Sequence, residues 1–245
     1  MVLLYNITMN ERIYLCKTEY LDVSVEKKDI MDKLPDYRKK KLEKIKNETA
    51  WLESLTAGLL LVKGLAGYMK ISESEALECL NSKEHDIEKR NIIIYTKAER
   101  TKQIFYSISH SGGYVAAAFA SEAVGLDIET KDDRNFSVTR RMFSEEDKIY
   151  IGDSQERFRN IWTVKESFLK CTGEGIVVPL KSFISVKDSE AADDNTRWRI
   201  VSKGYDLKGK TYFVMTNVLD ENCSISICSE NPNIGLDIEW VKVLI

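Results

Sequence analysis

A long helical hydrophobic pattern constrains the fold of this chain more than any other feature. Between Glu48 and Met69, apolar residues recur close to every 3.6 positions for about six turns, which predicts one helix with a buried face. A shorter helix is expected after Ser72, because Ser72 and Glu75 have the spacing of a capping box. The apolar positions of the long helix are Trp51, Leu52, Leu55, Leu59, Val62, Leu65 and Ala66.

Short runs of β-type residues accompany these helices in both halves of the chain. Two of the runs flank Gly112-Gly113, which predicts a hairpin there. The polar, acidic stretch 187–196 predicts an exposed loop. Strands are expected at 2–7, 13–15, 91–95, 104–109, 114–120, 183–186, 198–201, 212–215 and 224–228, and further helices at 27–46 (broken at Pro35), 136–150 and 155–171. Helices and strands in both halves indicate an α+β fold.

A short sequence occurs twice, once in each half. The strand-like run 106–109 leads to Gly-Leu-Asp-Ile-Glu at 125–129, and the run 224–227 leads to the same five letters at 235–239. Two halves of similar plan would produce this near-repeat, and so would a chance similarity of short strands. We predict two similar α/β halves related by a pseudo-twofold, each a small, mostly antiparallel sheet packed with helices.

Length and composition set the number and kind of domains. The chain has 245 residues, of which 43% are hydrophobic, with 12 Gly and 3 Pro, so we expect a soluble globular protein with one large or two smaller domains. We place the halves at 1–122 and 123–245. No segment is expected to span a membrane or to act as a signal peptide.

Charge and cysteine usage exclude further classes. Lys and Arg total 36 against 39 Asp and Glu, a net charge of -3, which argues against a nucleic-acid partner. The five cysteines are scattered and form no C-x-x-C pair, so neither a disulfide framework nor a structural zinc site is expected. Reduced thiols of this kind favour a cytoplasmic location.

The first copy of the repeated sequence carries a pair of carboxylates. Asp127 and Glu129 point to one face of an extended segment, while Leu126 and Ile128 point to the other. Carboxylate oxygens suit a hard cation such as Mg²⁺, which would also relieve the repulsion between the two charges. An alternating strand with one face in solvent gives the same letters, so both interpretations stay open.

The predicted helix 155–171 adds a third carboxylate. Trp162, Glu166 and Lys170 recur at intervals of four and share one helical face. Glu166 could supply another metal ligand and Lys170 a phosphate partner, although Glu-Lys pairs at this spacing are also common on exposed helices.

Both histidines and one basic run were considered as further site residues. His110 lies between Ser109 and Ser111 beside a glycine turn, where it could help to bind an anion or simply hold the turn. His85 lies in a polar stretch and is expected at the surface. The predominantly basic run 38–46 fits either a solvated helix face or a polyanion site.

The order of these motifs resembles a known family. Ser109-His110-Ser111, then 125–129, then Phe143-Ser144, then residues 162–170 are similar to the S-H-S, G-x-D-x-E and W-x-x-K-E-x-x-x-K motifs of 4′-phosphopantetheinyl transferases. The likeness is to the long, pseudo-dimeric branch that activates non-ribosomal peptide and polyketide synthetases. It implies transfer of the phosphopantetheine arm of coenzyme A to a serine of an acyl or peptidyl carrier protein, releasing adenosine 3′,5′-bisphosphate.

The resemblance also implies a division of roles around a metal ion. Asp127, Glu129 and Glu166 would hold Mg²⁺ against the pyrophosphate, and Glu166 would act as the general base for the carrier serine, either directly or through a metal-bound water. The second copy, Asp237 and Glu239, is expected to hold no metal, because no helix follows it to supply a third ligand.

Phosphate contacts and docking are implied in the same way. Lys170 and His110 would bind phosphate oxygens, and Lys170 would stabilise charge on the leaving side. Ser109 would help to seat the coenzyme, and Lys165 would make another phosphate contact. Residues 173–183, together with the helix before them, would dock the carrier protein, and the branch implies a monomer.

Three positions depart from the family pattern. The expected arginine before Ser54-Leu55, which grips the 3′-phosphate of the coenzyme, is absent, and Lys40 or its neighbours could replace it. Only Lys97 remains of the expected G-[KR]-P motif. Asp147 stands where Glu is common. Two alternatives therefore remain: a degenerate relative that binds carrier proteins without catalysis, and a generic Mg²⁺ phosphoesterase.

Overall fold

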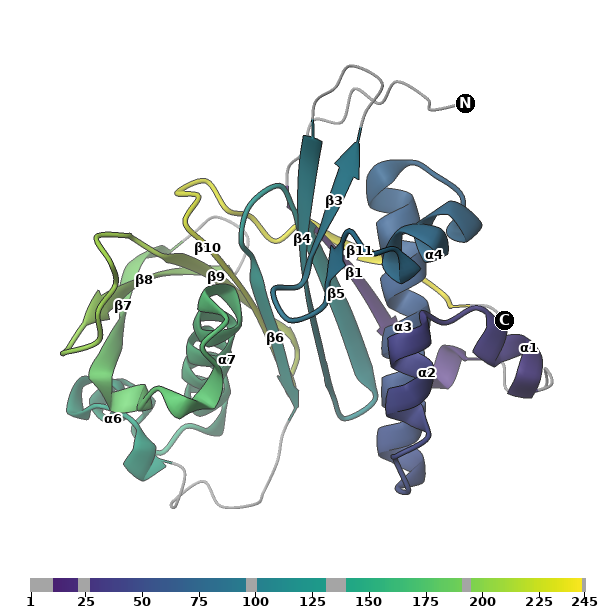
Figure 1. The fold of residues 1–245 in the computed structure, drawn as a ribbon. Helices are drawn as coiled ribbons and strands as arrows, with labels where there is room; N and C mark the ends of the chain where they lie inside the picture. Colours follow the sequence, from purple (N-terminus) through teal and green to yellow (C-terminus); the bar gives the residue numbers. More distant parts are fainter. Residues whose placement is uncertain (1–10, 22–26, 96–100, 131–139, 191–194, 244–245) are drawn as a thin grey trace. The chain divides into compact units, whose positions relative to one another are not determined.

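The computed structural model describes residues 11–21, 27–95, 101–130, 140–190 and 195–243 (Figure 1). The fold is α+β, with two mostly antiparallel sheets. The chain divides into two compact units, one formed by residues 1–122 and 237–245 and the other by residues 123–236. Each unit has its own sheet and its own hydrophobic core.

The sheet of the first unit contains six strands in the described part of the chain, in the order β11-β1-β5-β4-β3-β2. Its neighbouring strands are antiparallel except for β1 and β11, which pair in parallel. The strands are β1 (Arg12–Lys17), β2 (His85–Asp86), β3 (Asn91–Tyr95), β4 (Thr101–Ser111), β5 (Tyr114–Ala120) and β11 (Ile238–Trp240).

Four helices accompany this sheet, and one of them covers it (Figure 1). They are α1 (Lys27–Asp32), α2 (Asp36–Leu42), α3 (Glu48–Met69) and α4 (Glu73–Asn81). α3 lies close to the sheet at Gly64, where an added Cβ would lie 2.6 Å from the ring of Phe119. A hairpin with positive φ at Gly112 (55°) and Gly113 (84°) joins β4 to β5, as predicted.

Local signals set the helix boundaries in this unit. The Asn47 side chain accepts a hydrogen bond from the Ala50 amide at 2.9 Å at the start of α3, and Lys70 ends the helix in a left-handed conformation with φ 56°. The predicted break at Pro35 is confirmed, and so is the capping box of Ser72 and Glu75. The strand predicted at 2–7 lies outside the described residues.

The prediction that His85 lies at the surface is wrong. Its side chain is buried, and its two ring nitrogens lie 2.7 Å from the Leu80 carbonyl oxygen and 2.7 Å from the Tyr106 hydroxyl. Burial lowers the pKa of His85, which favours the neutral imidazole. The polar neighbours in the sequence concealed this position because β2 is short and places alternate residues on opposite faces.

The sheet of the second unit has five described strands, all antiparallel, in the order β6-β10-β9-β8-β7. The elements are β6 (Gly125–Thr130), α6 (Glu145–Ile151), α7 (Gln155–Thr172), β7 (Phe183–Glu190), β8 (Thr196–Ser202), β9 (Phe213–Asp220) and β10 (Cys223–Ser229). Short 3₁₀ turns lie at Thr18–Tyr20 in the first unit and at Arg140–Met142, Gly175–Val177 and Leu180–Ser182 in the second. α7 packs on β6, β10 and β9 around a core that includes Phe168, Phe183 and Trp198.

Two predicted segments of this unit differ from the structure. Residues 187–196 are not simply a loop, because β7 continues to Glu190 and β8 begins at Thr196, which pair with each other. The helix predicted at 136–150 is shorter in its described part, where α6 starts only after Ser144 caps it by accepting a hydrogen bond from the Asp147 amide. Polar composition alone did not reveal that the ends of this stretch are paired strands.

The boundary predicted at 123–245 also needs correction. β11 pairs with β1, so residues 237–245 belong to the first unit. The two copies of the repeated pentapeptide therefore have different partners: β6 pairs antiparallel with β10, whereas β11 pairs in parallel with β1. The near-repeat does not correspond to equivalent strand pairs.

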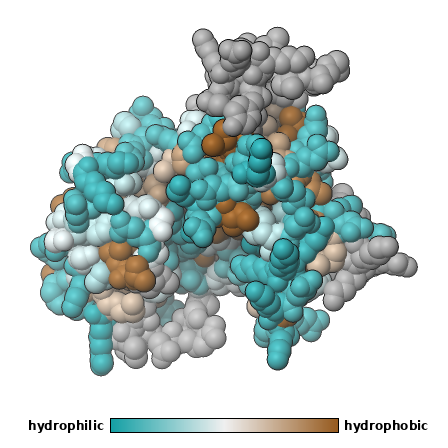
Figure 2. All heavy atoms as spheres, viewed as in Figure 1, coloured by the Kyte–Doolittle hydropathy of each residue, from teal (hydrophilic) through white to brown (hydrophobic). Residues whose placement is uncertain are grey.

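The described surface gives no indication of a membrane-spanning element. None of the helices in the described residues is both long and apolar enough to cross a bilayer. In the view of Figure 2, hydrophilic residues cover most of the visible surface of each unit and hydrophobic residues form small separate patches.

The glycines that begin the two pentapeptides offer a matched test of packing. A Cβ atom on Gly125 would overlap the Ser167 carbonyl oxygen and the Cys171 amide nitrogen, both in the backbone of α7, whereas a Cβ on Gly235 would meet no atom within 4 Å. We expect Gly125→Ala to destabilise the protein by about 3 kcal/mol and Gly235→Ala to be nearly neutral. Urea unfolding of the two variants measures this, and equal stabilities would contradict the close approach of α7 to β6.

Candidate active site

The carboxylates of β6 lie on the face of the sheet that α7 covers. Gly125 faces the α7 backbone, and Asp127 and Glu129 follow it at intervals of two, on the same side of the strand. Their partners across the ladder are Ser226 and Ser224 of β10. The predicted alternation is thus present, but Asp127 is only 5% exposed, so this face is not a solvated one.

Buried hydroxyl groups support this region from β10 and β9. The Ser226 hydroxyl lies 2.8 Å from that of Thr163 and 2.7 Å from that of Thr216, and the Ser224 hydroxyl donates to the Asn160 side chain at 2.7 Å. These bonds hold α7 against the strands at the level of the two carboxylates. Sequence reasoning missed them, although the alternation of serine and isoleucine at 224–227 places both hydroxyls on one face.

Lys170 and Glu166 of α7 complete the polar cluster. The Lys170 ammonium donates to the Asp127 carboxylate at 2.6 Å, a partly buried ion pair. α7 spans Gln155–Thr172, and its Lys170 and Glu166 side chains interact with the acids of β6. Four predicted site residues of the second unit therefore belong to one electrostatic cluster: Asp127, Glu129, Glu166 and Lys170.

The Glu166 carboxyl group has a raised pKa. Burial, together with the negative charges of Asp127 and Glu129, raises the pKa of Glu166 to about 7, against the opposing effect of Lys170. Its Oε1 atom is buried and has no hydrogen-bond partner among the described residues. A bound cation would stabilise a buried carboxylate oxygen of this kind, which lies beside two other acids.

The predicted three-carboxylate metal set is not assembled in this arrangement. Within the described residues, no three His, Cys, Asp or Glu side chains are grouped so that they could hold a metal ion. Lys170 supplies the local positive charge instead. The donor chemistry still fits a hard divalent cation, because all three groups are carboxylates and Glu166 Oε1 lacks a partner.

The raised pKa of Glu166 predicts how stability depends on pH. Since the pKa of about 7 lies above the ordinary 4.5, protonated Glu166 stabilises the folded state, and this contribution is lost as pH rises through 7. Without added metal, Glu166→Gln should therefore raise Tm by a few degrees at pH 8 and much less at pH 5. Calorimetry at both pH values measures the difference; a larger gain at pH 5 would contradict the assigned shift.

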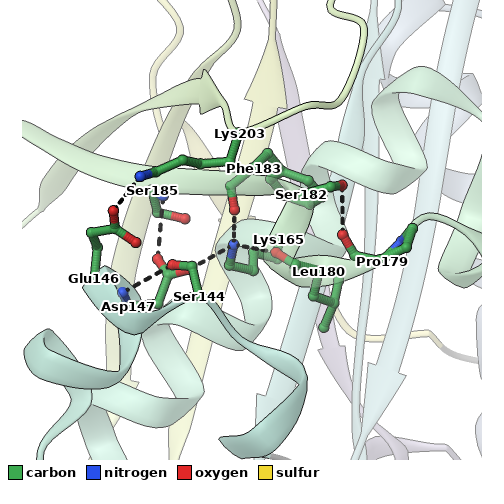
Figure 3. A network of polar contacts seen from close by, with 10 residues as sticks. All are labelled: Ser144, Glu146, Asp147, Lys165, Pro179, Leu180, Ser182, Phe183, Ser185 and Lys203. Atoms are coloured by element: carbon green, nitrogen blue, oxygen red, sulfur yellow. Dashed lines mark hydrogen bonds and ion pairs between the residues drawn. The ribbon is translucent and has the colours of Figure 1, made fainter.

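Lys165 lies beside Glu166 in sequence but points into the core. Figure 3 shows its ammonium surrounded by three oxygens: Asp147 Oδ2 at 2.8 Å, and the carbonyls of Leu180 at 2.8 Å and Phe183 at 2.6 Å. Its side chain is completely buried. The predicted phosphate contact of Lys165 is at odds with this position, because the ammonium has no exposed surface and its three hydrogens have protein acceptors.

Asp147, noted above only as a departure from the family pattern, is the centre of the same network. It accepts a hydrogen bond from the Ser144 hydroxyl at 2.6 Å and another from the Ser185 amide at 3.3 Å (Figure 3). The network therefore links α6, α7 and β7. A capping serine followed by an acid three residues later was visible in the sequence, but its burial and its lysine partner were not.

The S-H-S segment lies at the end of β4, in the first unit. His110 Nδ1 lies 3.1 Å from Glu53 Oε2, and the Gly113 amide donates to Glu53 Oε1 at 2.9 Å. Ser109 is buried. The Glu53 carboxylate of α3 thus occupies the glycine turn that the sequence indicated as a possible anion site. Glu53 also lies in the segment where the family pattern has an arginine.

The basic residues of α2 differ in exposure. Arg38 is 6% exposed and donates to the Ser54 carbonyl at 2.8 Å, while Lys40 is exposed. Burial lowers the pKa of His110, Glu53 acts in the opposite direction, and the positive charges of Lys41 and Arg38 lower it further. Lys97 lies outside the described residues.

The second acidic pair has a different environment. Arg12 forms ion pairs with Asp237 at 3.3 Å and with Glu239 at 3.4 Å, and both carboxylates are about half exposed or more. The first copy is buried beside a helix and the second is neutralised at the surface. Of the two copies, the first has a third acid, Glu166, and a lysine, Lys170, beside its carboxylates.

Comparison with known proteins finds similarity in the part of the chain that contains this cluster. The family model described as the 4′-phosphopantetheinyl transferase superfamily matches residues 123–216. The chain is 30% identical over 142 residues to 4′-phosphopantetheinyl transferase Sfp of Bacillus subtilis (strain 168), which covers 56% of this chain and 60% of Sfp.

Other relatives match over shorter spans. The 4′-phosphopantetheinyl transferase gsp of Aneurinibacillus migulanus is 31% identical over 101 residues, covering 37% of this chain and 43% of the relative. A putative 4′-phosphopantetheinyl transferase of Haemophilus influenzae is 34% identical over 85 residues, covering 31% and 36%. The chain thus matches at most about three fifths of these relatives, and the family match contains the whole carboxylate cluster. Over residues 123–216, this chain is similar to the 4′-phosphopantetheinyl transferase superfamily.

Proposed function

We propose that this protein transfers the 4′-phosphopantetheine group of coenzyme A to a serine of an acyl or peptidyl carrier protein and releases adenosine 3′,5′-bisphosphate. The observation that carries the proposal is Glu166, a buried carboxyl with a pKa of about 7 beside Asp127 and Lys170. This group lies within the residues that match the family model. A base with a pKa near neutrality is suited to accept a proton from an alcohol at the pH of the cell.

Glu166 is the proposed general base. The carrier serine oxygen forms a bond to the β-phosphorus, the bond from that phosphorus to the bridging oxygen breaks, and the serine proton passes to the Glu166 carboxylate. Adenosine 3′,5′-bisphosphate leaves with the electron pair of the broken bond. Lys170, which pairs with Asp127 in this structure, would bind the phosphate oxygens and stabilise their charge.

Mg²⁺ is the proposed cofactor, and Asp127, Glu129 and Glu166 are the residues that would hold it. Bound there, the ion would neutralise the pyrophosphate and orient it for attack. Burial and the acidic neighbours disfavour ionised Glu166 in this structure, so additional positive charge would make the base available at lower pH.

The first unit supplies the other proposed coenzyme contacts. In this proposal, His110 binds a phosphate group of coenzyme A and Ser109 helps to position the coenzyme. Lys40 attracts the coenzyme with an exposed positive charge. Lys97, which lies outside the described residues, is proposed to contact the coenzyme as well. Residues 173–183 are the proposed docking region for the carrier protein, and Val177 within this region is 87% exposed.

The finer biological assignments rest on the family resemblance alone. We assign the protein to the long branch, with two similar halves, acting as a cytoplasmic monomer on carrier domains of non-ribosomal peptide or polyketide synthetases.

Mass spectrometry of an apo carrier protein incubated with this protein, coenzyme A and Mg²⁺ tests the function. We expect a mass gain of one phosphopantetheine that disappears in EDTA. A folded protein that modifies none of several carriers would instead be a binding module. Release of adenosine 3′,5′-bisphosphate without any carrier would indicate a phosphoesterase.

A further inference from the structure

The contact between Glu53 and His110 is unusual because one carboxylate bridges a turn and an imidazole. Glu53 comes from the second turn of α3, and both of its oxygens are used: Oε1 accepts from the Gly113 amide at 2.9 Å and Oε2 lies 3.1 Å from His110 Nδ1. The Glu53 side chain is 12% exposed, and that of His110 is 33% exposed. The carboxylate is therefore fixed from two sides, whereas the imidazole remains accessible.

This geometry determines which ring nitrogen is available. A carboxylate only accepts hydrogen bonds, so Nδ1 must carry the proton in the bridge, and Nε2 is left for a further hydrogen bond. No partner of Nε2 is found among the described residues. An anion that approached this nitrogen would draw a second proton onto the ring.

The surroundings are basic apart from Glu53. The groups that act on His110 are Glu53 of α3 and, from α2, Lys41 and Arg38. Arg38 is only 6% exposed, and its Nε has no hydrogen-bond partner among the described residues. Two cations and an imidazole beside one fixed acid leave net positive charge for a phosphate.

We propose that Glu53 is a positioning residue for His110, which holds Nδ1–H and stabilises the imidazolium so that Nε2–H can bind a phosphate group of the coenzyme. This inference rests on the proposed function for the identity of the phosphate. In other proteins, too, a carboxylate that accepts a hydrogen bond from one ring nitrogen of a histidine fixes which nitrogen carries the proton. It does not compete with the phosphate, because its oxygens face Nδ1 and the turn.

Histidine NMR titration provides a direct test, since the chain has only two histidines. Glu53→Gln keeps an acceptor for Gly113 but removes the negative charge, and we expect the pKa of His110 to fall by about one unit or more. Buried His85 is the internal reference and should not move. Glu48→Gln, at an exposed position of the same helix, makes the same change in net charge and should leave the pKa of His110 unchanged.

Binding of adenosine 3′,5′-bisphosphate, measured by calorimetry from pH 5.5 to 8.5, tests the role toward phosphate. Affinity of the wild type should weaken as pH rises and His110 loses its proton. In Glu53→Gln this weakening should shift to lower pH and reduce affinity by about tenfold at intermediate pH, as one pKa unit implies.

The outcomes separate the two proposals. If the bisphosphate binds and Glu53→Gln leaves the pKa of His110 unchanged or raises it, the positioning role is wrong. Tighter binding in Glu53→Gln would show that the carboxylate obstructs the site, which also overturns the role. If the wild type binds no bisphosphate, the phosphate role fails together with the coenzyme part of the proposed function, and the titration alone then decides whether Glu53 stabilises the imidazolium.

Discussion

Glu166→Gln should lower the rate of phosphopantetheine transfer by about 10²- to 10⁴-fold, the usual contribution of a positioned general base. The amide has nearly the same shape as the carboxyl group but accepts no proton. Because the same variant is expected to stabilise the protein at pH 8, lower activity would be accompanied by higher stability. Loss of folding therefore could not explain the loss of rate.

Transfer rates measured with purified carrier protein check this expectation. Glu156→Gln is the matched control, since Glu156 is an exposed acid in the first turn of the same helix. The wild-type rate should rise with pH as Glu166 ionises and then level off, at or below pH 7 when a cation is bound. Transfer by Glu166→Gln at the wild-type rate would contradict the assigned role of Glu166.

Lys165→Met should destabilise the protein by about 3–5 kcal/mol, the loss expected when one partner of a buried ion pair is removed. The substitution leaves Asp147 charged and completely buried, and it also leaves the carbonyls of Leu180 and Phe183 without their donor. Chemical denaturation at neutral pH measures the change. Since the network links α6, α7 and β7, the loss should affect cooperative unfolding of the second unit.

Lys203→Met is the appropriate control. Lys203 pairs with Glu146 at the edge of the same network (Figure 3), but both side chains are nearly half exposed. Such a pair contributes about 0–1 kcal/mol. Equal destabilisation by the two substitutions would mean that Lys165 does not hold this part of the unit together.

The elements that could be predicted from sequence are those whose signals are local. The boundaries of α3 agree with the prediction at both ends, because the hydrophobic period is long and Asn47 caps the start. The hairpin at Gly112-Gly113 was predictable for a similar reason, since two glycines readily adopt the positive φ that the turn requires. The alternation in β6 and the stripe on α7 likewise follow from periods of 2 and 3.6.

The parts that sequence reasoning missed depend on residues far apart in the chain. Lys165 and Lys170 are both basic residues of one helix, yet one is buried against Asp147 and the other pairs with Asp127 beside Glu166. Only the packing of α7 against α6, β7 and β6 separates their roles. The partnership of Glu53 with His110 joins α3 to the end of β4, and no spacing rule relates two such positions.

The parallel pairing of β11 with β1 has a consequence for biosynthesis. Residues 123–236 are continuous, so the second unit emerges from the ribosome complete, whereas the first must wait for 238–240 before its sheet gains its last strand. Until then, the outer side of β1 presents unpaired backbone groups that another nascent strand could join. The synthesis of the first unit thus begins first but ends last, when Ile238–Trp240 becomes available to pair with β1.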